Sequence, residues 1–209
     1  MAKKNLLALG AFLGWFAVIT QFILMLNNRV ASVPETIVRF FSFFTILTNL
    51  IVAVYYTIHW LQKPTSLLLR LQKPGILSAI TLYIAVVGLV YQIVLRSIWS
   101  PVGIQKLVDE LLHSIIPVFT LVYWFLYEKH NEASWKSIPS WLLYPLFYLA
   151  FILIRGSISN FYPYPFVNVT ELGLQKVLIN SSVLVFVFLS IAIGLVACSK
   201  LLTKKVPHI

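Results

Sequence analysis

The chain has 209 residues, of which 60% are apolar and 11% charged, with a net charge of +10 and a mean hydropathy of +0.90. Soluble domains are roughly half apolar and one quarter charged, so this composition excludes a soluble globular protein and predicts an all-α polytopic membrane protein. The lysines and arginines lie between apolar segments, where they favour membrane topology and contact with anionic lipids, so the charge does not indicate nucleic-acid binding.

Six stretches are long and apolar enough to cross a bilayer, which takes roughly 20 residues. We expect spans at about 5–26, 36–61, 76–98, 105–128, 138–158 and 172–200, in a single transmembrane domain and a six-helix bundle over residues 1–209. The first run is too long for the apolar region of a typical signal peptide, so we interpret it as a span.

Basic residues predict the orientation of these spans. Ten lysines and arginines, among them Lys205, fall on the termini and on the second and fourth connections, against six on the opposite side. The positive-inside rule therefore predicts that both termini are cytoplasmic.

The second connection contains the phrase Leu-Gln-Lys-Pro twice, at 61–64 and 71–74. Prolines with basic residues are typical of an interfacial loop, so we interpret the connection as a cytoplasmic interfacial segment rather than an architectural repeat.

The fourth span begins with two acids and a histidine, Asp109, Glu110 and His113. Ionisable residues at membrane depth are costly, which makes them candidates for function. On a helix Asp109 and His113 share a face, so the carboxylate can reach the imidazole. The three side chains are in principle metal ligands, but there is no HExxH pattern, no Cys/His cluster and no second histidine deep in a span. We expect neither a metal nor another cofactor.

Polar residues of several spans converge in the outer half of the bilayer. From the helical rise, His113 lies roughly 12 Å below the external face, Ser42 roughly 10 Å and Asn180 roughly 14 Å, with Arg96 and Arg155 nearer the mouth. Stripes of polar residues facing lipid are costly, so we expect a polar cavity that opens externally. The alternative is that the Ser, Thr and Asn residues only hydrogen-bond neighbouring helices.

These groups fit a nucleophile and its general base. His113, oriented by Asp109 or Glu110, can activate a hydroxyl on another helix, with Ser42 ranked before Thr45 by depth. Hydrogen-bond donors for an oxyanion or for substrate come from five further residues: Arg39, Tyr148, Arg155, Tyr164 and Asn180. An aromatic belt at the membrane interface is the alternative role of Tyr164.

Three phrases carry a family resemblance: Arg39-Phe-Phe-Ser-Phe-Phe-Thr-Ile-Leu-Thr-Asn49, Leu112-His113 followed by Pro117, and Tyr164-Pro-Phe166. Together they resemble the androgen-induced-protein family of six-helix membrane proteins, and most of all its bacterial branch. The resemblance implies a location in a bacterial plasma membrane.

The resemblance also implies an activity, because animal members are intramembrane threonine hydrolases that cleave fatty acid esters of hydroxy fatty acids. Matching the phrases places Ser42 at the nucleophile position and His113 at the base, with a serine where the animal proteins have threonine. The expected partners are then membrane lipids and a lipid ester substrate. A transporter or non-enzymatic lipid-binding protein that uses the same cavity is the competing hypothesis.

Overall fold

The computed structural model describes residues 1–63 and 65–204, so Pro64 of the first Leu-Gln-Lys-Pro phrase and Lys205 of the charge count lie outside the described residues. Helices make up most of this part of the chain, and no strand occurs among those residues. Within the described ranges, six helices are long and apolar enough to cross a membrane: Ala2–Asn27, Phe44–Leu61, Ile76–Leu95, Gly103–Tyr127, Trp135–Ser159 and Leu174–Thr203. The predicted all-α polytopic architecture is confirmed.

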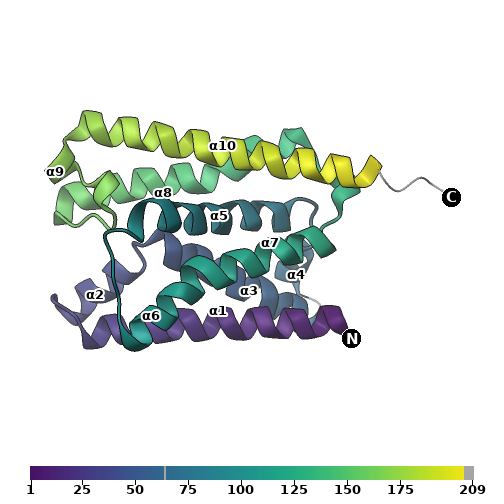
Figure 1. Ribbon diagram of the computed structural model, residues 1–209, viewed down its shortest axis with the longest axis horizontal. Helices are drawn as coiled ribbons and strands as arrows, with labels where there is room; N and C mark the ends of the chain where they lie inside the picture. The colour runs from purple at the N-terminus through teal and green to yellow at the C-terminus, as the bar shows by residue number, and fades with distance from the viewer. Residues whose placement is uncertain (64, 205–209) are drawn as a thin grey trace. The chain divides into compact units, whose positions relative to one another are not determined.

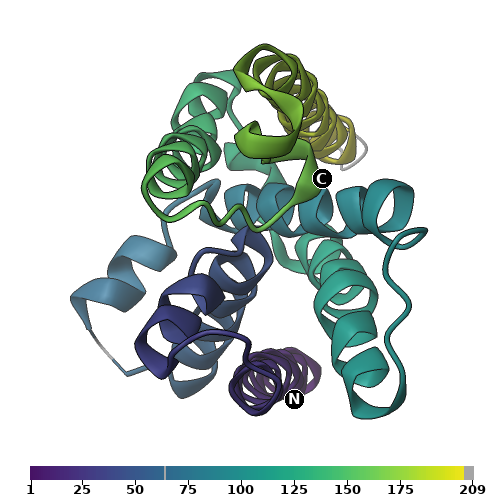
Figure 2. The same cartoon turned by 90° about the vertical axis from the view of Figure 1, so that its left-hand side faces the viewer.

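The chain divides into two compact units, Met1–Lys129 and His130–Ile209, called unit 1 and unit 2 below. Unit 1 contains α1 (Ala2–Asn27), α2 (Val33–Phe40), α3 (Phe44–Leu61), α4 (Ser66–Leu71), α5 (Ile76–Val90), α6 (Gly103–Glu110) and α7 (Ile116–Tyr127). Unit 2 contains α8 (Ile138–Ser159), α9 (Val169–Leu172) and α10 (Leu174–Lys204), together with short 3₁₀ turns. Figure 1 shows the long helices α1 and α10, and Figure 2 views the same helices from one end.

Helix α1 packs closely on α3 because small residues line the contact. A Cβ atom placed on Gly14 lies 2.8 Å from the Ala53 Cβ, and one on Gly10 lies 2.7 Å from the Tyr56 ring. Glycines four residues apart allow two membrane helices to approach closely. The opposite face of α1 exposes large apolar side chains such as Phe12, as a lipid-facing surface does.

The second span is not the continuous helix expected over 36–61, because α2 ends at Phe40 and α3 begins only at Phe44. The Ser42 hydroxyl donates to the Val38 carbonyl at 2.7 Å, and the Ser42 N–H donates to the Arg39 carbonyl three residues back. A side chain that bonds the preceding turn competes with regular helical hydrogen bonds, which accounts for a break here. Ser42 therefore lies in the break between two helices rather than on a span.

Two π-helical segments widen the helices of unit 1, Tyr91–Leu95 after α5 and Leu111–Ile115 between α6 and α7. The second segment has a cause in the sequence. Pro117 has no N–H for the His113 carbonyl and its ring clashes with that carbonyl in a regular helix. Accordingly, the Ile116 N–H donates to the Leu111 carbonyl five residues back.

Helix α5 approaches this second π-segment at Gly88. A Cβ atom at Gly88 lies 3.2 Å from the His113 carbonyl oxygen and 3.1 Å from the Pro117 Cβ. The glycine thus lets α5 contact the His113 backbone directly.

A polar clamp joins the start of α5 to the end of α7. The Glu128 carboxylate accepts from the Ser78 N–H at 2.9 Å and from the Ser78 hydroxyl at 2.8 Å, and the Trp124 indole donates to the same hydroxyl. A carboxylate at a helix N-terminus binds an otherwise unsatisfied backbone N–H and complements the helix dipole.

Candidate functional site

His113 lies in the π-segment Leu111–Ile115 with its side chain 12% exposed. Its Nδ1 lies 2.9 Å from the Asp109 carbonyl oxygen and 3.3 Å from the Asp109 carboxylate. Because a carbonyl oxygen only accepts, Nδ1 carries a proton and donates. In the neutral ring Nε2 is then the basic nitrogen.

Tyr91 contacts both Asp109 and His113. Its ring stacks on the His113 imidazole, with centroids 4.3 Å apart and an interplanar angle of 14°. Its hydroxyl donates to the Asp109 carboxylate. Tyr91 and His113 both lie in π-segments, a local structure that is frequent at functional sites.

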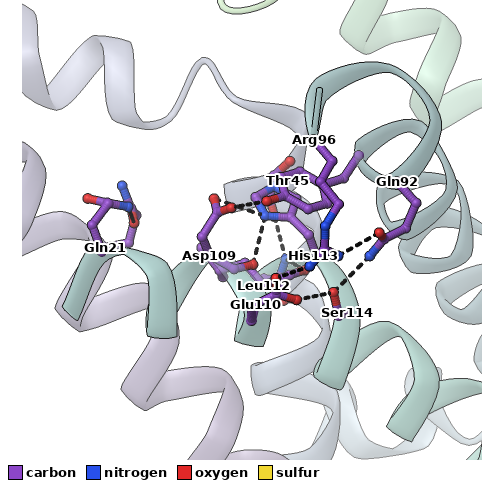
Figure 3. A network of polar contacts seen from close by, with 12 residues as sticks. Gln21, Thr45, Gln92, Arg96, Asp109, Glu110, Leu112, His113 and Ser114 are labelled. Atoms are coloured by element: carbon purple, nitrogen blue, oxygen red, sulfur yellow. Dashed lines mark hydrogen bonds and ion pairs between the residues drawn. The ribbon is translucent and has the colours of Figure 1, made fainter. Parts of the chain in front are cut away.

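Asn49 connects α3 to the π-segment that carries His113. The Asn49 side-chain amide donates to the Thr45 carbonyl at 2.9 Å and to the Leu112 carbonyl at 3.3 Å. Its Oδ1 atom is buried without a protein hydrogen-bond partner. The hydrogen bond from Asn49 to the Leu112 carbonyl holds the first turn of α3 against the π-segment. Thr45, which is 7% exposed, therefore lies beside Asp109 and His113, as Figure 3 shows.

Glu110 lies outside the Asp109 and His113 arrangement. Its carboxylate accepts from Arg96 at 2.5 Å and from the Ser114 hydroxyl at 2.7 Å, and Ser114 in turn accepts from Gln92. Figure 3 shows this second set of polar contacts along one side of His113. Of the two acids proposed to orient the imidazole, Asp109 is the one in contact with it.

Two of the residues proposed from the second span have local partners. Arg39 donates to Glu35 on α2 at 2.8 Å. Ser42 is fully buried and donates to the Val38 carbonyl. Of the proposed catalytic residues, the structure thus brings together His113, Asp109 and Thr45, whereas Ser42 lies in the break before α3.

The other four proposed residues belong to unit 2. Arg155 donates to the Phe161 carbonyl at 3.3 Å and lies over its ring, while Asn180 donates to the Phe166 carbonyl at 2.9 Å. Tyr164 stacks on Phe166, and Tyr148 is half-buried on α8. Arg155 and Asn180 thus hold the connection between α8 and α10, which gives both residues a structural role.

The role of Tyr91 is not visible in the sequence. It is 18 residues from Asp109, and its orientation depends on the π-segment Tyr91–Leu95, which no sequence pattern predicted. Pro117, four residues after His113, is the one local signal of a disturbed helix here. In the part of the chain that the structure describes, no three His, Cys, Asp or Glu side chains are grouped to hold a metal ion.

Comparison of the chain with known protein families, with curated proteins and with solved structures finds no match.

Proposed function

We propose that unit 1 hydrolyses lipid esters within the membrane, with His113 as the general base. The observation that carries the proposal is the contact between Asp109 and His113 Nδ1, at 2.9 Å for the carbonyl and 3.3 Å for the carboxylate. An acid that binds one nitrogen of an imidazole fixes its tautomer and stabilises the imidazolium that forms when the other nitrogen takes a proton.

The hydroxyl that His113 activates is assigned to Thr45. Asn49 ties the backbone at Thr45 to the His113 segment, and Thr45 lies in the first turn of α3 beside Asp109 and His113, whereas Ser42 lies in the break before α3. Ser42 stays the second candidate, because the family resemblance places it at the nucleophile position.

In the proposed reaction, Nε2 of His113 removes the proton from the Thr45 hydroxyl while the Thr45 oxygen attacks the carbonyl carbon of the ester. The imidazolium then returns that proton to the departing alcohol, which leaves an acyl group on the hydroxyl oxygen. Water, deprotonated by the same nitrogen, attacks the carbonyl of this second ester, and the imidazolium returns the proton to the hydroxyl oxygen as the fatty acid is released. Asp109 stabilises the imidazolium in both steps.

A lipid ester fits the surroundings of these residues. The site lies within helices that are apolar enough to cross a membrane, and Leu112 and Val108 beside it are buried. Bilayer depth favours a substrate with long acyl chains, and the resemblance favours a fatty acid ester of a hydroxy fatty acid.

The test is hydrolysis of such an ester by the purified full chain in nanodiscs. His113→Ala and Thr45→Val should each lower kcat at least about 100-fold, because the two groups act in the same step. Thr45→Ser, which keeps a hydroxyl, should retain activity. Thr48→Val is the matched control, since Thr48 is a buried threonine of the same helix.

Full activity of His113→Ala contradicts the mechanism. If Ser42→Ala is inactive and Thr45→Val active, the nucleophile is Ser42 instead. Saturable binding of the ester with no turnover by the unmodified chain supports the competing lipid-binding function.

A further inference from the structure

A second polar site lies at the other end of unit 1, in a cavity of about 340 Å³. The cavity is formed where α1 and α5 begin and where α3 and α7 end, together with the residues after α4. Figure 1 shows the start of α1, helix α4 and the end of α7 at the same end of this unit. Tyr123, a lining residue on α7, is 10 residues from His113, or about 15 Å at the helical rise, so the two sites are separate.

The cavity is cationic. Lys3, Lys73 and Lys129 line it, and among the described residues Glu128 is the one acid that lines it with them. Glu128 already accepts hydrogen bonds from Ser78 at the start of α5 and from the Lys129 N–H. The positive charge of the lysines therefore exceeds the negative charge of the lining.

Neutral hydrogen-bond donors accompany the lysines. The duplicated Leu-Gln-Lys-Pro phrase contributes Gln62 from its first copy, and Gln72 and Lys73 from its second copy. Tyrosines 55, 123 and 127 also line the cavity, as do the apolar residues Leu7 and Leu77. Ammonium, amide and phenol groups in the same lining as apolar side chains suit a phosphate group attached to an apolar or glycerol moiety.

We propose that this cavity binds an anionic phosphate group, either the headgroup of a phospholipid or a free phosphate ester. The helix ends that form it place it at the membrane interface, where lipid phosphates lie and where soluble phosphate esters arrive. The proposal is independent of the hydrolytic site, because none of its residues lies in the His113 arrangement.

The chain offers two matched pairs of lysines for the test. Lys3 lines the cavity and its neighbour Lys4 does not, while Lys73 lines it and Lys63, at the same position of the other Leu-Gln-Lys-Pro phrase, does not. Lys3→Gln/Lys73→Gln and Lys4→Gln/Lys63→Gln remove the same charge. If binding depends only on the overall positive charge, both double variants lose the same affinity for the probe. If the cavity is a specific binding site, only Lys3→Gln/Lys73→Gln loses affinity.

Two probes distinguish the sources of phosphate. Binding of phosphatidylglycerol to the detergent-solubilised full chain is measured by native mass spectrometry, with phosphatidylcholine as reference. Binding of glycerol 3-phosphate is measured by calorimetry on the chain in phosphatidylcholine nanodiscs. Saturable binding of the soluble ester assigns the site to free phosphate esters, and binding of the lipid alone assigns it to a headgroup.

The expected result is that Lys3→Gln/Lys73→Gln weakens binding of the recognised probe about 30-fold, and Lys4→Gln/Lys63→Gln less than about twofold. Circular dichroism of both variants checks that they fold. Equal weakening in the two double variants overturns the proposal, as does the absence of saturable binding of both probes to the unmodified chain.

Discussion

The Asp109 carboxylate contacts side chains from two helical segments, the Tyr91 hydroxyl after α5 and the His113 imidazole before α7. It is 5% exposed. A buried carboxylate is tolerated at such a position only when donors surround it, and the Tyr91 hydroxyl is one of these donors. Tyr91 therefore positions the acid that orients the imidazole.

We expect Tyr91→Phe to lower the free energy of unfolding by about 1–2 kcal/mol, because the carboxylate then loses a buried donor. The measurement is a double-mutant cycle with Asp109→Asn, in which the coupling energy between the two side chains is read directly. A coupling energy near zero means that the hydroxyl does not stabilise the carboxylate.

The contact between Asp109 and His113 could be predicted because it depends only on helical spacing, and it is confirmed at 3.3 Å. The partners Tyr91 and Asn49 could not be predicted, since their contacts depend on which helices are neighbours. The ranking of Ser42 by depth assumed a straight helix from residue 36, and the break before Phe44 removes that assumption.

At the scale of the elements, unit 1 is built on close helix approaches that glycines permit. Gly14 meets Ala53 of α3, and Gly88 meets the backbone of the His113 segment. The first contact stabilises the α1 and α3 pair, and the second sets the position of the proposed base. Substitution of Gly14 should therefore mainly lower stability, whereas substitution of Gly88 should mainly lower ester hydrolysis.

Gly14→Leu should lower the free energy of unfolding by about 1–3 kcal/mol, because a Cβ at 2.8 Å from the Ala53 Cβ forces the helices apart. Gly194→Leu is the control within a helix, since a Cβ atom there meets nothing within 4 Å. Denaturant or thermal unfolding in detergent measures both variants, and equal stability contradicts the packing argument.

Gly88→Val should lower ester hydrolysis more than stability, because its Cβ would lie 3.2 Å from the His113 carbonyl and must displace that segment. The comparison of kcat with the midpoint of unfolding separates the two effects. A variant with unchanged kcat contradicts the view that Gly88 positions His113.

At the scale of the whole molecule, composition and the apolar stretches of the chain were sufficient to predict an all-α protein with six spans, since a span depends on the length and hydropathy of its stretch. The division into two compact units was not predicted, because it depends on which helices contact one another. The orientation in the membrane depends on charges in the connections and stays a prediction.

Cytoplasmic termini predict an asymmetric labelling pattern. In a Cys198→Ala background, which removes the single cysteine, Thr170→Cys should react with a membrane-impermeant maleimide in intact cells. Lys63→Cys should react only after lysis, because it lies on a connection of the opposite side. The reverse pattern shows that the termini face outward.

The clamp between Ser78 and Glu128 has a consequence for synthesis. The two residues are 50 positions apart, so α5 enters the bilayer before the carboxylate that caps it exists. At about 5–20 residues per second, the first turn of α5 waits about 3–10 s for its partner. Glu128 is the next-to-last residue of unit 1, so unit 1 acquires this bond only as its translation finishes.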